Sequence, residues 1–325
     1  MSSSMNISKH VSHRLSGLRG ALGTLLVLCG AAGVMGLPAA GPRTVVKPAE
    51  KAAEEPAEKV KSRPPASVTL VAAKGGRVKA GETVDLGLAF KVDKEWHIYW
   101  KGLNDTGMAP TVELELPAGW KRGEMLWPAP SRYVAPGDIV DHILEGEPLI
   151  ILPVTVPKDA KPGRVTLKGR AAWLVCKDLC LRGAGDVQVD VDVVADDAAP
   201  AKPAETDVLA AKFAATRAMV ARPLPSDGSV KADFDALAGK VVFFAKGAAG
   251  LTYFPEVDTR RASDMLSGVS SDGEMLTVAF ASDQSQLQIS GVLEVKLAEG
   301  KDGAGTKQWY QVRLPVAEAK REPAK

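Results

Sequence analysis

Between residues 67 and 194 the chain alternates short apolar runs with polar turns, and the runs have the period of β-strands. Gly and Pro punctuate the pattern, for example at Gly75-Gly76 and Pro162-Gly163. The strand-like runs are SVTLVAA, TVDLGLAF, TVELELP, LIILPVTV, RVTLKGRAAWLV and DVQVDVDVV. Seven or so strands in about 125 residues, without a helical window longer than two turns, predict an antiparallel sandwich of immunoglobulin-like size. We place this domain at 67–195.

The pattern changes after a second Ala/Pro/Asp-rich joint at 196–206. The next segment predicts a helix up to residue 221, because Leu209, Phe213, Thr216 and Val220 share one face. From Phe234 onward β-type runs return: KVVFFAK, LTYFP, MLTVAF, QLQISGVLEVKL and WYQVRLPV. The fold class is therefore all-β, with the sandwich followed by a smaller β-rich domain (207–325) that one helix leads. This second domain contains neither Cys nor His, so we expect a structural or docking role.

The first 40 residues have the pattern of an export signal. Lys9, Arg14 and Arg19 precede an uncharged run with a short Leu/Val-rich centre, and small residues follow it. A retained N-terminal anchor is the alternative. Residues 41–66 are rich in Pro, Ala, Glu and Lys and predict a disordered tether. We therefore expect an extracytoplasmic protein, located in the periplasm or cell envelope, with membrane anchoring as the alternative to a cleaved signal.

Composition narrows the function classes. Apolar residues make up 46% and charged residues 25% of the chain, which is enough for a buried core. The formal charge is only +2, and the signal holds three basic residues and no acid, so the rest of the chain is close to neutral. Such a chain lacks the basic surface that nucleic-acid binding needs. Neither a G-x-S-x-G elbow nor a phosphate-binding glycine loop occurs.

Candidate chemistry is confined to one cysteine pair. Cys29 lies in the signal, which leaves Cys176 and Cys180 as the cysteines of the exported chain. In an oxidising compartment such a pair forms a disulfide unless it is kept reduced. The segment must bend to allow this, as a helical turn or a tight hairpin, because two cysteines four residues apart are too distant in an extended strand. The spacing alone leaves redox exchange, a structural staple and a metal site open.

The metal alternative needs further ligands. His97 and His142 are the histidines that follow the signal, so these two residues with Cys176 and Cys180 make a hypothetical Cys2His2 site for zinc or copper(I). His97 lies between Trp96 and Ile98 in a strand-like run, which favours a buried sandwich position. We expect His142 to lie in a loop.

Several motifs occur in an order that points to a known family. They are Glu95-Trp96-His97-Ile98-Tyr99-Trp100, Asn104-Asp105-Thr106-Gly107, Leu126-Trp127-Pro128-Ala129-Pro130, Glu145-Gly146-Glu147, Leu152-Pro153-Val154, the stretch from Pro157 to Gly163, and Trp173-Leu174-Val175-Cys176 with Cys180. In these features the sequence resembles the N-terminal domain of the DsbD/ScsB-type thiol:disulfide interchange proteins. Tyr253-Phe254-Pro255, Asp272-Gly273 and Ser290-Gly291-Val292-Leu293 extend a weaker similarity into the second half.

The resemblance implies an immunoglobulin-like domain whose cysteine pair, here Cys176 and Cys180, shuttles between dithiol and disulfide. It implies no cofactor, a membrane-embedded thiol-disulfide reductase as electron donor, and exported thiol proteins as acceptors. By the same analogy Cys180 attacks first. Family members shield the pair with an aromatic cap loop, whereas the matching place here holds His142, Ile143 and Leu144.

Relatives also carry membrane and thioredoxin-like domains that this sequence lacks, so we expect the reductase to act in trans. The alternative function is a non-enzymatic binding or scaffold protein whose disulfide is a permanent staple, and a copper(I)-handling thiolate site is a third.

Overall fold

The structure is a computed structural model that describes residues 63–195, 206–281, 288–298 and 306–316. The predicted signal at 1–40, most of the linker at 41–66 and the joint at 196–205 lie outside the described residues. In the part of the chain that is described, no helix has both the length and the apolar character needed to cross a membrane.

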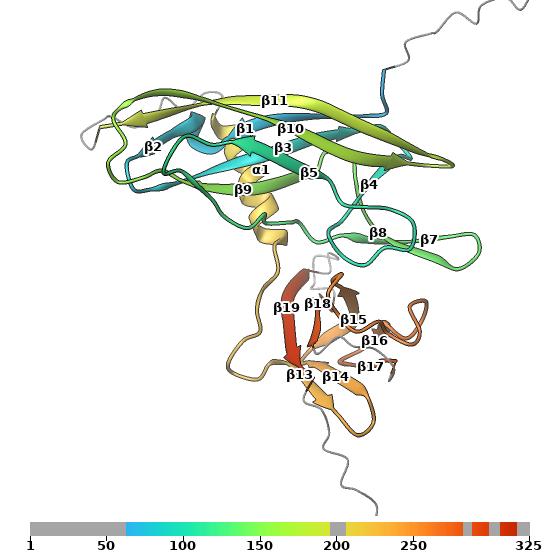
Figure 1. The fold of residues 1–325 in the computed structure, drawn as a ribbon. Coiled ribbons are helices and arrows are strands. Elements are labelled where there is room, and N and C mark those ends of the chain that lie inside the picture. The colour runs from blue at the N-terminus through green and yellow to red at the C-terminus, as the bar shows by residue number, and fades with distance from the viewer. Residues whose placement is uncertain (1–62, 196–205, 282–287, 299–305, 317–325) are drawn as a thin grey trace, which may run out of the picture. The chain divides into compact units, whose positions relative to one another are not determined.

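The first half is a sandwich of two sheets, as the alternating pattern predicts (Figure 1). One sheet is antiparallel and contains, in spatial order, β1 (Ala66–Ala72), β3 (Thr83–Val92), β9 (Leu149–Thr155) and β6 (Lys121–Arg122). The other contains β2 (Arg77–Lys79), β11 (Cys180–Val194), β10 (Gly163–Cys176), β4 (His97–Tyr99), β8 (Ile139–Glu145) and β7 (Ser131–Ala135), with β5 (Thr111–Glu115) paired to β10. A four-residue 3-10 helix, η1 (Ala73–Gly76), joins β1 to β2.

All six predicted runs of the first half are strands. The structure adds five others, β2, β4, β6, β7 and β8, which the pattern did not resolve. Three of these have only two or three residues, too few to display a period. β8 has seven residues, but its sequence IVDHILE places Asp141 and His142 in the middle and hides the alternation.

The core of the sandwich lies between the sheets and includes Leu86, Leu88, Ile150, Leu152 and Trp173. Five tryptophans contribute to this core: Trp100, Trp127 and Trp173 are buried, and Trp96 and Trp120 pack against it. Burying each aromatic side chain in this way removes a large apolar area from water and stabilises the sandwich.

β9 is buried on both faces, which explains its unbroken apolar sequence. Ile150 and Leu152 point into the sandwich, while Leu149 and Ile151 pack against Phe213 of the helix α1 (Thr206–Met219). The predicted face of this helix is confirmed, since Phe213 and Thr216 are buried. A Cβ at Gly87 would lie 2.5 Å from Leu149 and 3.0 Å from the Phe213 ring, so a glycine there allows the close approach of the helix.

The second half is a smaller β-rich domain (Figure 1). Its larger sheet contains β12 (Arg222–Pro223), β19 (Lys307–Pro315), β18 (Gln288–Leu297), β15 (Ala248–Pro255) and β16 (Ser270–Asp272). Its smaller sheet contains β13 (Val230–Asp235), β14 (Lys240–Ala245) and β17 (Met275–Ala279). Its core includes Phe243, Tyr253, Leu293 and Val312.

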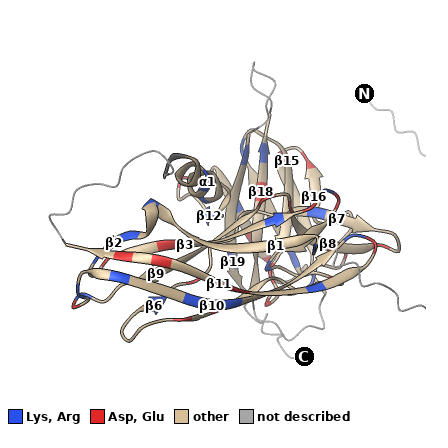
Figure 2. Cartoon of the chain, turned by 90° about the horizontal axis from the view of Figure 1, so that it is seen from above, with Lys and Arg blue, Asp and Glu red and all other residues tan. Residues whose placement is uncertain are grey.

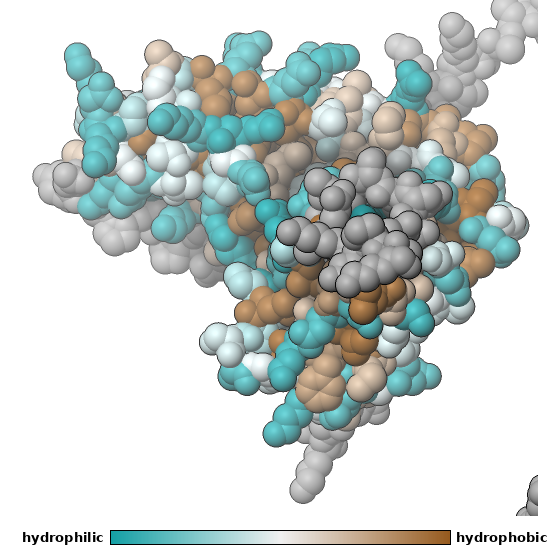
Figure 3. Space-filling model, turned by 60° about the horizontal axis from the view of Figure 1, so that its bottom comes forward, coloured by the Kyte–Doolittle hydropathy of each residue, from teal (hydrophilic) through white to brown (hydrophobic). Residues whose placement is uncertain are grey.

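Basic and acidic residues are interspersed over the strands (Figure 2), in agreement with the near-neutral charge. Figure 3 shows one face, on which hydrophobic side chains lie in small groups among hydrophilic ones. Among the described residues, Leu179 and Leu181 are exposed large apolar side chains, and both lie beside Cys180 in the sequence.

Candidate functional site

The two cysteines lie at the tip of the longest hairpin of the molecule. Cys176 ends β10, Cys180 begins β11, and the two residues are the last paired positions of the ladder. Their Cα atoms are 4.2 Å apart and the sulfurs form a disulfide. The turn between them is tight, since the Lys177 amide donates to the Leu179 carbonyl over 3.2 Å. Of the geometries open at the sequence level, the structure shows the hairpin.

The two sulfurs belong to residues with unequal burial. Cys176 is only 2% exposed, whereas Cys180 lies in the exposed part of the tip. Burial follows from the neighbours: β10 is an inner strand of its sheet, and Cys176 pairs with His97 of β4. An incoming thiolate must approach a sulfur along the disulfide axis, so unequal burial makes the two cysteines inequivalent toward a partner.

β4 brings two aromatic side chains to the disulfide. His97 and Tyr99 are two residues apart and so share a face of the sheet, and Cys176 shares it through the register. The Tyr99 hydroxyl lies 3.5 Å from Cys180 Sγ. The rings of His97 and Tyr99 meet edge to face, with centroids 5.4 Å apart.

A chain of hydrogen bonds leads from the sulfur to a buried carboxylate. The Thr106 hydroxyl donates to Asp141 Oδ2 over 2.5 Å, and the Thr106 amide donates to Asp141 Oδ1 over 3.0 Å. The Thr106 oxygen is 3.3 Å from the Tyr99 hydroxyl. The Thr106 hydroxyl uses its single proton in the hydrogen bond to Asp141, so the Thr106 oxygen can only accept a hydrogen bond from Tyr99. The single Tyr99 proton therefore has two acceptors within reach, Thr106 Oγ1 and Cys180 Sγ.

Burial shifts the pKa of both aromatic residues in ways that keep them neutral. Desolvation is the main cause that raises the pKa of Tyr99, so its hydroxyl remains a donor at neutral pH. Desolvation likewise lowers the pKa of His97, against the opposing charges of Asp141 and Glu145. Neither side chain brings a formal charge to the disulfide at pH 7.

The region predicted as a cap is a strand, and this corrects the loop expected at His142. His142, Ile143 and Leu144 lie in β8, where successive side chains point to opposite faces. Ile143 pairs with Tyr99 and shares the face of the site. Leu144 belongs to the sandwich core, and the fully buried His142 packs edge to face against Phe254 at 5.5 Å. The three residues were predicted to act as one group because the apolar pattern does not reveal the strand β8.

An aromatic side chain does stand over the site, but it comes from the preceding strand. The ring of Tyr133 in β7 lies 5.0 Å from that of His97, and Tyr133 pairs with Asp141 across the β7–β8 hairpin. The sequence did not predict a role for Tyr133, because the cap was expected directly before Glu145. The signal was present in Tyr133-Val134, which follows a Pro-rich turn and precedes Pro136-Gly137.

Lys177, in the turn between the two cysteines, forms an ion pair with a neighbouring carboxylate. Lys177 Nζ lies 2.7 Å from Glu95 Oε2, and both side chains are exposed. The hydrogen bond between them raises the pKa of Lys177 and lowers that of Glu95. Lys177 therefore directs its charge toward Glu95, and an exposed pair of this kind contributes little to stability.

The four candidate metal ligands are not gathered. Within the described ranges, no three or more His, Cys, Asp or Glu side chains form a group that could hold a metal ion. His97 is next to Cys176 in register, but His142 points to the opposite face, where its Nδ1 lies 2.6 Å from the Leu103 carbonyl. Because a carbonyl only accepts, Nδ1 carries the proton.

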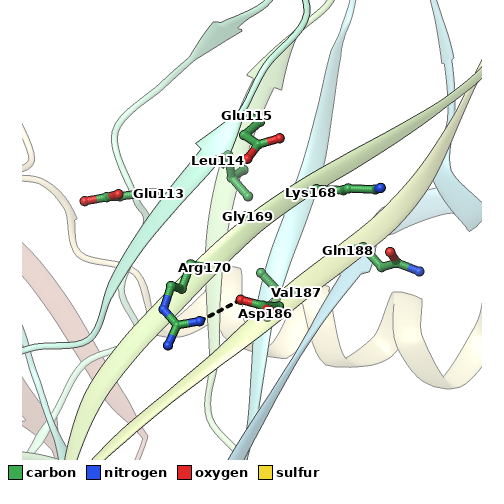
Figure 4. A pocket seen from close by; sticks show the side chains of 9 residues that line it. All are labelled: Glu113, Leu114, Glu115, Lys168, Gly169, Arg170, Asp186, Val187 and Gln188. Atoms are coloured by element: carbon green, nitrogen blue, oxygen red, sulfur yellow. Dashed lines mark hydrogen bonds and ion pairs between the residues drawn. The ribbon is translucent and has the colours of Figure 1, made fainter.

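Two clefts lie along the β10–β11 ribbon. One, with a volume of about 780 Å³, is lined by Glu113, Glu115, Lys168, Arg170, Asp186 and Gln188 among others. Figure 4 shows Arg170 directed at Asp186, with which it forms an ion pair of 2.8 Å. Arg170 lies six residue pairs from the tip, so at about 3.3 Å per residue this cleft is roughly 20 Å from the disulfide. The other, of about 370 Å³, is apolar and closer to the tip, and it is lined by Met108, Trp173, Leu174 and Gly183 among others.

A comparison with protein families accounts for this arrangement. The family model described as the N-terminal region of the thiol:disulfide interchange protein DsbD matches residues 68–191. The sandwich resembles the DsbD N-terminal domain. The resemblance expected from the motifs is thereby confirmed, and the match contains both cysteines, β4 and the β7–β8 hairpin of this DsbD-like sandwich.

Solved structures give weaker similarities. The N-terminal periplasmic domain of ScsB from Proteus mirabilis is 14% identical, with 76% of this chain and 92% of that chain covered and a TM-score of 0.48. A protein of unknown function from Porphyromonas gingivalis W83 is 12% identical over 77% of this chain and 99% of that one, with a TM-score of 0.23. The comparison with curated proteins gives no match. The functional assignment therefore rests on the DsbD family model and on the site.

Proposed function

We propose that the chain is an extracytoplasmic thiol:disulfide interchange module that passes electrons through Cys176 and Cys180 to exported thiol proteins. The observation that carries the proposal is the unequal burial of the pair. One cysteine is exposed at the hairpin tip and the other is buried beside β4. On this proposal a partner attacks the sulfur of the exposed residue, Cys180, while the buried residue, Cys176, provides the leaving sulfur.

The exchange balances as follows. A thiolate of a reducing dithiol protein attacks Cys180 Sγ, the Sγ–Sγ bond breaks, and Cys176 leaves as a thiolate. The second thiolate of the donor then attacks the donor sulfur of this mixed disulfide and releases the Cys180 thiolate. The donor becomes a disulfide, the pair has gained two electrons, and two protons from water complete the dithiol. The same steps in reverse reduce a disulfide of an exported acceptor protein.

Tyr99 has a defined role in this sequence. The Tyr99 hydroxyl can donate its hydrogen bond to Thr106 Oγ1 or to Cys180 Sγ, because both acceptors lie within 3.5 Å. A thiolate is a much stronger acceptor than a disulfide sulfur, so the hydrogen bond to Cys180 strengthens when the thiolate forms. Tyr99 thereby stabilises the reduced state without adding a charge.

The surroundings of Cys180 suit a protein partner. The side chains of Leu179 and Leu181 are 58% and 41% exposed on either side of it. Apolar groups that flank an exposed sulfur provide contact area for a docking protein. We propose that a membrane-embedded reductase acts in trans as the donor and that the pattern at 1–40 directs export.

A permanent staple fits the structure less well. The disulfide closes a loop of five residues at the end of a ladder that already pairs residues Gly163 to Cys176 with Cys180 to Val193. So short a loop gains about 2 kcal/mol from closure in the chain-entropy model, against nearly 5 kcal/mol for a loop of a hundred residues. A disulfide with this position adds little that the strands do not supply.

A redox titration of the full chain tests the proposal. The protein is equilibrated in a glutathione series and a dithiothreitol series, the thiols are alkylated, and the intact mass is measured. We expect a reversible two-electron transition between about −120 and −270 mV, the range of exchange proteins. A pair that stays oxidised below about −300 mV, or a reduction that unfolds the domain, would overturn it. The variant C176S/C180S is the control and shows no transition.

A further inference from the structure

The segment that follows Tyr99 is fastened to the C-terminal domain. Gly102 and Glu256 form an isolated antiparallel bridge, and the Leu103 amide donates to the Pro255 carbonyl over 2.9 Å. Lys101 Nζ lies 2.5 Å from Oε1 of Glu256, whose carboxylate is nearly buried. A Cβ on Gly102 would lie 2.6 Å from the Pro255 carbonyl oxygen, so the two backbones are in close contact.

The same segment is tied internally to the residues around the disulfide. The Asn104 amide group donates to the carbonyls of Trp100 and Gly102, and its oxygen accepts from the His142 amide over 2.7 Å. Asp105 accepts from the Val140 amide over 2.8 Å. Thr106, four residues beyond Gly102, lies within hydrogen-bond distance of Tyr99 and Asp141. The segment therefore links the C-terminal domain to the hydrogen bonds at Cys180.

The β7–β8 hairpin has its own attachment. The Arg132 guanidinium donates to the Met265 carbonyl over 2.7 Å and also to the Leu266 carbonyl. Arg132 precedes Tyr133, whose ring stands over His97. Arg261 of the C-terminal domain forms a further ion pair with Asp105.

The apolar core is continuous across these contacts. Phe254 and Val292 of the C-terminal domain belong to the core of the sandwich. The Phe254 ring packs edge to face against His142 and against Trp100, with a centroid distance of 6.5 Å to Trp100. Trp100 precedes Lys101 in the chain, and His142 follows Asp141. Both attached segments therefore have apolar as well as polar contacts with the C-terminal domain.

We propose that the C-terminal domain is a positioning module for the Cys176–Cys180 site, acting through the Lys101–Thr106 segment and the β7–β8 hairpin. The inference rests on the proposed function and assigns a role to the half of the chain that has no cysteine. Without these attachments, the Lys101–Thr106 segment and the β7–β8 hairpin would be held only by their hydrogen bonds within the sandwich. With them, Thr106 is held at the Tyr99 hydroxyl beside Cys180, and the Tyr133 ring is held at His97, before a partner arrives.

Two variants of the full chain each remove side-chain contacts between the sandwich and the C-terminal domain. Both leave the residues at the disulfide unchanged. R132M deletes the donors to Met265 and Leu266, and the double variant K101M/E256Q removes the Lys101 pair without leaving a buried charge unpaired. R170M is the matched control, because it removes an ion pair of β10 and β11 roughly 20 Å from the tip.

The readout is the pH profile of thiol reactivity. Each protein is fully reduced, and the rate at which iodoacetamide alkylates Cys180 is followed by peptide mass from pH 5 to 10. We expect both site-linked variants to react roughly two- to thirtyfold more slowly at pH 7 than the parent, with the profile displaced to higher pH. R170M should match the parent, and R132K should restore part of the rate.

Two failures are distinguishable. If the profiles of R132M and K101M/E256Q coincide with that of the parent while only their unfolding midpoints fall, the contacts are structural and the positioning role is wrong. If the parent itself shows no reversible transition in the glutathione titration, the proposed function fails, whatever the alkylation profiles show.

Discussion

The sandwich and the C-terminal domain are both β-structures with their own cores, but they treat buried polar groups differently. In the C-terminal domain two such groups are paired within the domain, and Glu256 is paired with Lys101 of the sandwich: the Thr259 hydroxyl accepts from the Ser290 amide over 2.9 Å, and Glu294 accepts from Trp309 Nε1 over 3.0 Å. In the sandwich the buried polar side chains are His97, Asp141 and His142, and all three lie in the strands next to the disulfide.

This difference separates stability from function. Buried polar groups are expensive unless they are paired, so a domain that serves only as a scaffold pairs them internally. In the sandwich, Asp141 and His97 lie on the face of the disulfide, where the hydrogen bond of Tyr99 can respond to a change of charge at Cys180. Four changes test this contrast.

The largest effect is expected from the cysteines themselves. C180S should abolish exchange, because no accessible sulfur remains, while C176S should leave a stable mixed disulfide with a donor thiol, since no buried thiol can resolve it. Either change should lower the free energy of unfolding by only about 2 kcal/mol. Intact mass after incubation with glutathione checks the first two outcomes, and urea denaturation checks the third. A C180S protein that still forms a mixed disulfide through Cys176 would contradict the assignment of the attacked sulfur.

The second test sets a buried polar group of one domain against one of the other. D141N should cost roughly 1–3 kcal/mol, because the amide cannot accept both hydrogen bonds from Thr106. It should also make Cys180 more reactive at pH 6, since a negative charge near the thiolate is removed. T259V should cost a similar amount by leaving the Ser290 amide unpaired, but should leave the alkylation profile unchanged. Equal profiles for the two variants would remove the contrast.

Acid should weaken the molecule through His142. Desolvation is the main cause that lowers the pKa of this histidine, and Arg132 lowers it further, against Asp141, Asp105 and the Leu103 carbonyl, which raise it. A depressed histidine pKa means that the unfolded chain binds the proton more readily, so stability is fully present above the unfolded value near 6.5 and declines as the pH falls below it. H142Q should flatten the dependence of the unfolding midpoint between pH 7 and 5. A parent protein equally stable at both values would contradict this.

The smallest effect is expected from Tyr99. Y99F removes one hydrogen bond to the thiolate, so the pKa of Cys180 should rise and its alkylation at pH 7 should slow by about three- to tenfold. Y253F is the matched control, because its hydroxyl donates over 2.7 Å to the Ser290 carbonyl inside the C-terminal domain. Y253F should lower the stability of the fold but leave the rate at Cys180 unchanged. A faster reaction in Y99F would mean that the hydroxyl shields the sulfur and does not stabilise its charge.

Patterns along the chain predicted the classes of structure and placed the candidate chemistry at one cysteine pair. Alternating apolar runs predicted the strands β1, β3, β5, β10 and β11, and a continuous apolar run predicted β9, because a strand with one buried face alternates its apolar residues and one with two buried faces does not. The same reasoning located the helix, whose buried residues Phe213 and Thr216 are three apart. Cysteine spacing required a bend between Cys176 and Cys180, because an extended strand separates the two too far for a disulfide.

Only the tertiary structure decided what surrounds that disulfide. β4 and β8 acquire their identity from pairing with β10 and with each other, which no local period records. Tyr99, Thr106, Asp141 and Tyr133 lie between 39 and 81 positions from Cys180 in the chain, and they meet because the spatial order β10-β4-β8-β7 differs from the chain order. The contacts of Lys101 and Arg132 with the C-terminal domain likewise join residues more than 130 positions apart. Sequence patterns report the interactions of neighbours, whereas a site that several strands build is fixed by the pairing of the whole sheet.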